Sequence, residues 1–262
     1  MRLAVVMLDL RLRRRMLIGT SLGAALYLFL IIVMYPSFRQ DASINEMIAA
    51  NPTAAAAFGV TGSITTPAGW LGANMYANIG PVLVLLLTIG YGASAIAGQL
   101  ADGLLSVVAT QPYTRRRLVA EKTLALLVVS LAVPVASLVV SLTAPRYDLH
   151  PDWAALVGVT ISLTLLGFDL GALALALGVL TGSRGAGLGI AAGVGAATYL
   201  VSSLAPAVHW VHAIRWLSPF YWAVGDNQLS DGVPWQGWTL LVALGVVLVG
   251  IALVGVRRLD IP

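Results

Sequence analysis

The stretch AALVGVTISLTLLGFDLGALALALGVL, residues 154–180, contains a single ionisable residue, Asp169. A helix needs about 20 predominantly apolar residues to cross the hydrocarbon core of a bilayer. In lipid, backbone N–H and C=O groups have no water to bond, so they must be satisfied within the segment. We therefore predict that residues 154–180 form a transmembrane helix.

Five further apolar runs have the length of membrane-spanning helices. They are Met16–Tyr35, Gly80–Leu100, Thr123–Thr143, Gly185–Ala205 and Trp238–Val256. Mean hydropathy is +0.90, and 10% of the 262 residues are charged, against about 25% in soluble domains. The sequence thus predicts an all-α membrane protein, with one transmembrane domain over residues 1–262 and six transmembrane helices. TGSR at 181–184 is a helix-stop and turn signal, which predicts a tight hairpin between the fourth and fifth helices.

The distribution of basic residues predicts the orientation of the chain, because lysine and arginine gather in cytoplasmic loops. Of the 15 Lys and Arg residues, all but Arg39, Arg146 and Arg215 fall on the side of the two termini. The seven tryptophans all fall on the opposite side, where an interfacial indole buries its ring and keeps its N–H hydrated. We expect both termini to be cytoplasmic. Because the chain has no cysteine, disulfide and thiolate chemistry are excluded.

The sequence also predicts the structure of three segments outside the apolar runs. Residues 1–15 alternate apolar and basic side chains, which predicts an amphipathic helix lying on the inner leaflet; an unstructured basic flank is the alternative. Residues 36–78 form an outer loop, and residues 206–237 are expected to form interfacial half-helices on the outer side. His209 and His212 lie in the latter segment, but no cysteine or obvious carboxylate nearby completes a metal site, so we expect none.

The stretch ATQPYTRRRLVAEK, residues 109–122, gathers three consecutive arginines and the only lysine of the chain. It closes the loop 99–122 between the second and third crossings, in which a short apolar helix is expected to end at Pro112. This loop resembles that of the type-2 permease family of ATP-binding-cassette (ABC) exporters. The residues that carry the resemblance are Gln99, Asp102, Gly103, Leu104, Leu105, Val108, Pro112, Thr114, Arg115, Leu118 and Lys122. Gln99 stands where the family usually has glutamate, and Leu104, Leu105 and Ser106 replace its Thr-Leu-Glu.

The resemblance extends over nearly the whole chain and includes LSPFYW at 217–222 and RRLD at 257–260. It implies a type-2 (type V) exporter transmembrane domain, the permease subunit of a bacterial ABC exporter in the plasma membrane. In the family, a coupling helix in this loop docks on an ATPase subunit. Carried over, the ATPase-coupling residues are Asp102, Gly103, Leu104, Leu105, Val108, Pro112, Arg115, Arg116 and Arg117.

The resemblance also implies partners: two ABC ATPase subunits and a second permease copy or paralogue. The basic residues flank the apolar runs, which predicts contact with membrane lipid and none with nucleic acid. No G-x-x-x-x-G-K-[ST] phosphate-binding motif contains Lys122, the only lysine, so the chain is not expected to be an enzyme. ATP and Mg would be bound by the partner ATPase.

Asp169, Gly189 and Gly193 are candidates for the substrate path or for helix packing. A carboxylate in the membrane costs about 3 kcal/mol on insertion scales, so Asp169 is expected to face a cavity, a partner or the subunit interface. It either binds a cation or proton, or only fixes helix packing. Small residues four apart allow close helix contact; Gly189 and Gly193 continue such a spacing from Gly185, and Gly167 and Gly171 form another.

Two other function classes remain open. A secondary transporter using Asp169 is opposed by the lack of clear inverted repeats. A membrane-embedded enzyme is opposed by the lack of H-E-x-x-H and G-x-S-x-G motifs.

Overall fold

The computed structural model describes residues 4–39, 50, 63–101, 114–206, 208–225, 229, 232 and 235–258. These residues form helices and turns and contain no strand, so the predicted all-α class is confirmed. The long helices are α1 (Ala4–Phe38), α5 (Ile79–Ala95), α8 (Arg115–Ser141), α9 (Trp153–Thr181), α10 (Arg184–Leu204) and α14 (Trp235–Gly255). The shorter ones are α4 (Pro67–Leu71), η1 (Gly72–Tyr76), α6 (Ala97–Ala101), η2 (Ala144–Tyr147), α11 (His209–Ile214), η3 (Arg215–Leu217), α12 (Pro219–Val224) and η4 (Val256–Arg258).

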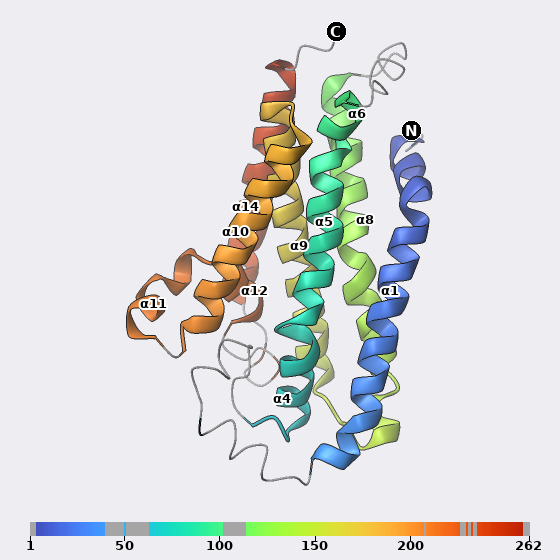
Figure 1. Ribbon diagram of the computed structural model, residues 1–262, viewed down its shortest axis with the longest axis vertical. Coiled ribbons are helices and arrows are strands. Elements are labelled where there is room, and N and C mark those ends of the chain that lie inside the picture. The colour runs from blue at the N-terminus through green and yellow to red at the C-terminus, as the bar shows by residue number, and fades with distance from the viewer. Residues whose placement is uncertain are drawn as a thin grey trace.

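Six segments of the described chain are long and apolar enough to cross a membrane, as predicted. Five of them correspond to the long helices α1, α8, α9, α10 and α14; the sixth, Pro67–Ala95, combines α4, η1 and α5. The six run side by side in one bundle, in which the start of α1 and the end of α14 lie at the same end (Figure 1). We call this end, which also holds α6 and the start of α8, the terminal end.

Helix α9 is the centre of the bundle. In its most apolar stretch 72% of the residues are buried, against 17% in α1 and in α10. It packs against α5, α8, α10, α12 and α14, whereas α1 packs mainly on α8. Helices α1 and α10 therefore present long apolar faces outside the bundle, where lipid or a partner subunit would cover them.

The predicted hairpin between α9 and α10 has a local cause. Gly182 adopts a left-handed conformation with φ 65° and ends α9, a conformation that glycine adopts without steric penalty. Ser183 then caps α10, because its side-chain oxygen accepts a hydrogen bond from the backbone N–H of Ala186.

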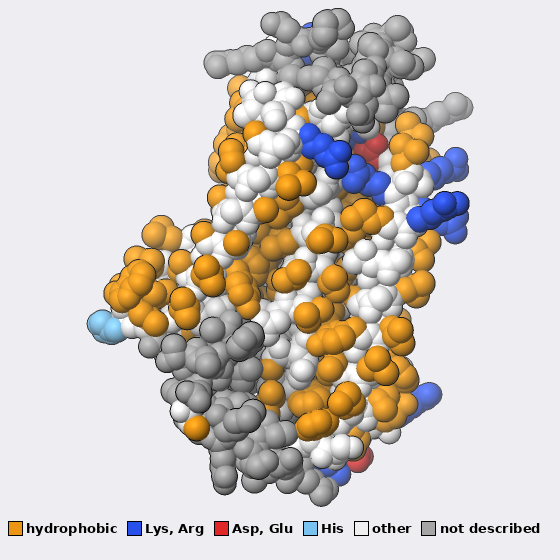
Figure 2. All heavy atoms as spheres, viewed as in Figure 1, with side chains coloured by type: hydrophobic (Ala, Val, Ile, Leu, Met, Phe, Trp, Pro, Cys, Tyr) orange, Lys and Arg blue, Asp and Glu red, His pale blue; other side chains and the backbone are white. Residues whose placement is uncertain are grey.

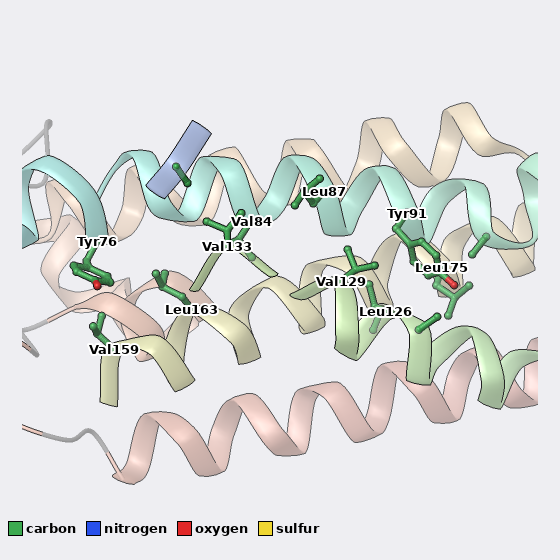
Figure 3. Close-up of a cluster of buried hydrophobic side chains, with 14 of the residues drawn as sticks. Tyr76, Val84, Leu87, Tyr91, Leu126, Val129, Val133, Val159, Leu163 and Leu175 are labelled. Carbon is green, nitrogen blue, oxygen red and sulfur yellow. The ribbon is translucent and has the colours of Figure 1, made fainter. Parts of the chain in front are cut away.

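Five buried hydroxyl side chains within the crossings are satisfied locally. The hydroxyls of Thr88, Ser137, Ser141, Thr160 and Thr164 each donate to the backbone carbonyl four residues earlier, at 2.8–3.0 Å. This pattern lets hydroxyl groups sit among apolar neighbours without water. The core between α5, α8 and α9 is otherwise apolar, and Figure 3 shows its side chains interleaved, with Tyr76 near one end and Tyr91 near the other.

The N-terminal segment differs from its prediction. Residues 4–15 are helical, but they form no separate interfacial helix: α1 continues without a break through the first crossing to Phe38. The first turns run along α8 (Figure 1). The physical reason is that Asp9 and the backbone N–H of Val5 bond to side chains of α8. These bonds hold the basic segment against the bundle.

The third crossing also begins earlier than its apolar run, at Arg115 instead of Thr123. Thr114 caps the helix by accepting a hydrogen bond from the backbone N–H of Arg117. Arg, Leu, Val, Ala, Glu and Lys continue without a helix breaker, so the basic cluster becomes the first turn of α8.

Candidate functional site

A buried ion pair joins α1 to α8 at the terminal end. The ammonium nitrogen of Lys122 lies 2.8 Å from both carboxylate oxygens of Asp9. The two side chains are only 1% and 5% exposed. Because an unpaired charge in this environment costs several kcal/mol, each residue depends on the other.

Tyr91 brings α5 into the same cluster. Its hydroxyl donates to Asp9 Oδ2 at 2.6 Å, and the guanidinium of Arg13 stacks over its ring with 4.9 Å to the centroid. Arg13 also donates to the Ser94 hydroxyl oxygen, three residues further along α5. Side chains of α1, α5 and α8 thus meet around one carboxylate.

A second carboxylate extends this linkage toward the start of α8. Glu121 accepts a hydrogen bond from the backbone N–H of Val5, at 3.1 Å, and another from Arg117 Nε, at 3.0 Å. It therefore satisfies one of the backbone donors that a helix start leaves unpaired. We call Asp9, Arg13, Tyr91, Glu121 and Lys122 the anchor cluster.

The anchor cluster brackets the predicted coupling loop. The chain leaves α6 at Ala101 and enters α8 at Arg115. Tyr91 lies ten residues before the first of these positions and Lys122 seven after the second. Both flanks of the loop are consequently bonded to α1.

The predicted coupling residues divide between described and undescribed parts of the chain. Asp102, Gly103, Leu104, Leu105, Val108 and Pro112 lie outside the described residues. Arg115 and Arg116 are exposed on the first turn of α8. Arg117 is half-buried and pairs with Glu121.

Sequence reasoning did not find the Asp9–Lys122 pair. The two residues stand 113 positions apart, and no periodic pattern relates positions so distant. A weak signal was available: Asp9 is the one acidic residue among the first 15, and Lys122 the one lysine of the chain. A lone carboxylate in one basic segment can pair with a cation of the other, such as Lys122.

Asp169 lies inside the subunit. It is completely buried, and neither carboxylate oxygen has a hydrogen-bond partner in the described chain. Helix α14 covers it, since a Cβ placed on Gly245 would lie 2.7 Å from Asp169 Oδ1. Among the described residues, the Asp169 carboxylate therefore lies between α9 and α14.

Two of the candidate residues, Gly189 and Gly193, face away from the described bundle. A Cβ on Gly189 or Gly193 would meet no heavy atom within 4 Å. The residues that pack into the bundle are Gly187, Ala191 and Gly195, on the neighbouring register. Helix packing within this chain therefore uses small residues other than Gly189 and Gly193.

The geometry defines a multi-pass helical membrane protein in which one loop at the terminal end is bonded on both flanks to the first helix. The sequence matches the family described as ABC-2 family transporter protein over residues 3–260, and the chain belongs to that family. A search among curated proteins returned no match. As a member of this family it is a membrane permease subunit of an ABC transporter, a class that works with ABC ATPase subunits.

Proposed function

We propose that this permease is the membrane subunit of a bacterial exporter, driven from the cytoplasmic side of the plasma membrane through the loop 99–122. Two permease chains and two ATPase subunits would make up the complex, with ATP and Mg bound by the ATPases. The observation that carries the proposal is the anchor cluster, which bonds both flanks of this loop to α1. The excess of arginine on the same side supports a cytoplasmic terminal end.

The anchor cluster suits the transmission of a displacement. Long helices move as rigid bodies, and packed interfaces switch between discrete arrangements. A shift of the loop would displace the start of α8. Lys122 would pull Asp9 and hence α1, while Tyr91 would link the movement to α5. ATP-driven closure could then favour one of two membrane arrangements, inward-facing or outward-facing.

The open face of α10 is a candidate for the interface with the second permease or for the substrate path. Gly189 and Gly193 leave its backbone uncovered, and Leu188, Ile190 and Val194 are exposed on the same helix. In lipid, uncovered small residues permit close approach of another helix.

Charge reversal at the start of α8 tests the docking role. Arg115→Glu combined with Arg116→Glu is expected to lower recovery of the partner ATPase with the permease by at least about tenfold, equal to about 1.4 kcal/mol. The reason is that exposed arginines beside the loop would face the ATPase. The measurement is co-purification from membranes, with ATP-dependent transport as a second readout.

Arg14→Glu with Arg15→Glu is the matched control, because it makes the same charge change on exposed positions of α1. Both variants are compared after membrane insertion has been verified by terminal tag accessibility. Equal ATPase recovery from the two variants would remove the docking role of the α8 arginines.

The secondary-transport alternative predicts that Asp169 must ionise during transport. Because Asp169 is fully buried beneath α14, we expect Asp169→Asn to keep ATP-dependent transport within about twofold of wild type across pH 6 to 8, a change of about 0.4 kcal/mol. Transport assays in proteoliposomes containing the ATPase provide the measurement. A pH-dependent loss of transport without loss of folded protein would instead favour proton or cation coupling at Asp169.

A further inference from the structure

A cavity of about 240 Å³ opens beside the anchor cluster, lined by α1, α5, α6 and the start of α10. Its polar lining includes Arg13, Ser94, Gln99 and Arg184, and Leu12 and Asp9 also border it. Two basic side chains, Arg13 of α1 and Arg184 of α10, therefore border the same cavity.

The two arginines reach the cavity by different routes. Arg13 is held by stacking on Tyr91 and by its bond to Ser94. Arg184 lies over α6, where its Cδ would be 3.7 Å from a Cβ added to Gly98. Both guanidinium groups carry a positive charge.

The cavity has a net positive charge. Asp9 is the acidic group of its lining, and its carboxylate is already bonded to Lys122 and Tyr91. Neither Arg13 nor Arg184 forms an ion pair within 4.0 Å with an acidic side chain of the described chain. An anion between the two guanidinium groups would relieve their repulsion and accept several charge-assisted hydrogen bonds.

An apolar stripe leads from the cavity along α5. Positions four apart lie on the same face of a helix. Counting back from Ser94 toward the start of α5 in steps of four gives Gly90, Leu86 and Val82. A Cβ on Gly90 would meet nothing within 4 Å, and Leu86 and Val82 are both 58% exposed. From Ser94 to Val82 the helix rises about 18 Å, close to the thickness of one leaflet, about 15 Å.

On this face of the bundle, hydrophobic side chains cover most of the length, while basic side chains gather toward the terminal end (Figure 2). Leu12, at the mouth of the cavity, is itself 73% exposed. A ligand that places a charged group in the cavity and apolar chains along α5 would match both surfaces.

We propose that this cavity binds a phosphate group, and that its source is an anionic phospholipid whose acyl chains lie on the Gly90–Leu86–Val82 stripe of α5. Arg13 and Arg184 hold the phosphate oxygens from two sides. Such a lipid would join α10 to α1 and α5, which Tyr91 and Arg13 already bond to each other at this end.

The test measures lipid retained by the purified full chain, with any co-purifying ATPase left in place, by native mass spectrometry after exchange into phosphatidylglycerol or phosphatidylcholine. Phosphatidylglycerol is expected to bind more tightly to wild type. Arg13→Gln with Arg184→Gln should weaken its binding at least about tenfold, because two charge-assisted contacts are lost. Arg14→Gln with Arg15→Gln removes the same charge from exposed positions of α1 and should leave binding within about twofold, since surface charges act weakly on a specific site.

Gly90→Leu is a second variant that leaves both arginines intact and fills open space on the stripe. It should reduce phosphatidylglycerol binding while inorganic phosphate binding is unchanged. If inorganic phosphate bound in an arginine-dependent way, phosphatidylglycerol did not, and Gly90→Leu had no effect, the cavity would be a site for a soluble phosphate. The lipid part of the proposal would then be wrong. Equal lipid binding by wild type and the Arg13→Gln/Arg184→Gln variant, both verified as folded by their thermal unfolding, would overturn the proposal.

Discussion

Lys122→Met is expected to destabilise the folded permease by about 3–5 kcal/mol, the range found when one partner of a buried ion pair is removed. The substitution leaves Asp9, 5% exposed, with the Tyr91 hydroxyl as its remaining side-chain donor among the described residues. Methionine preserves the length and apolar stem of lysine, so lost packing contributes little. Thermal unfolding of the purified chain in detergent, followed by circular dichroism, would measure the loss.

A double substitution separates the effect of the lost charge on stability from the effect of altered packing. Asp9→Leu combined with Lys122→Met removes both charges, and we expect it to recover most of the stability lost in Lys122→Met, because apolar replacement of a whole buried pair is often neutral. Arg116→Met serves as the control for loss of one positive charge from the same helix at an exposed site. If Lys122→Met and Arg116→Met unfolded at the same temperature, the ion pair would have no part in holding α1 to α8.

Hydropathy predicted the six crossings because the signal repeats over many residues and errors at a few positions do not change it. The boundaries moved where specific bonds intervened. Arg115, Arg116 and Arg117 were expected in the loop before the third apolar run, but a threonine cap and helix-forming neighbours extend α8 over them. Residues 4–15 were expected on the inner leaflet, but bonds to Glu121 and Lys122 hold them along α8.

The face of α10 that packs could not be predicted from its glycines. Small residues occupy every second position of its first half: Gly185, Gly187, Gly189, Ala191, Gly193 and Gly195. A four-residue spacing can therefore be drawn in two registers, 185–189–193 and 187–191–195, and sequence alone gives no reason to prefer either. The structure buries the second, because α9 and α5 supply the neighbours of Gly187 and Gly195. In α9, by contrast, Gly167 and Gly171 do meet side chains and backbone of α5 and α8.

Gly92→Ala is expected to destabilise the permease by about 3 kcal/mol, at the upper end of the usual range for overpacking. At this position α5 crosses α9 so closely that an added Cβ would collide with the carbonyl oxygen of Gly171 and would lie 3.1 Å from the backbone nitrogen of Leu175. Backbone atoms within a helix cannot rotate away as a side chain can, so the two helices must separate. Thermal unfolding and the yield of folded protein would both fall.

Gly90→Ala provides a control two residues away on the same helix, because its Cβ would meet no heavy atom within 4 Å. Alanine has the higher helix propensity, so this variant should be unchanged or more stable by up to about 1 kcal/mol. Because lipid tails are as apolar as the helix surfaces, the hydrophobic effect contributes little to the association of α5 with α9. Close van der Waals contact between their backbones must hold them together. Equal unfolding temperatures for Gly92→Ala and Gly90→Ala would show that the close crossing of α5 and α9 is not what holds the centre of the bundle together.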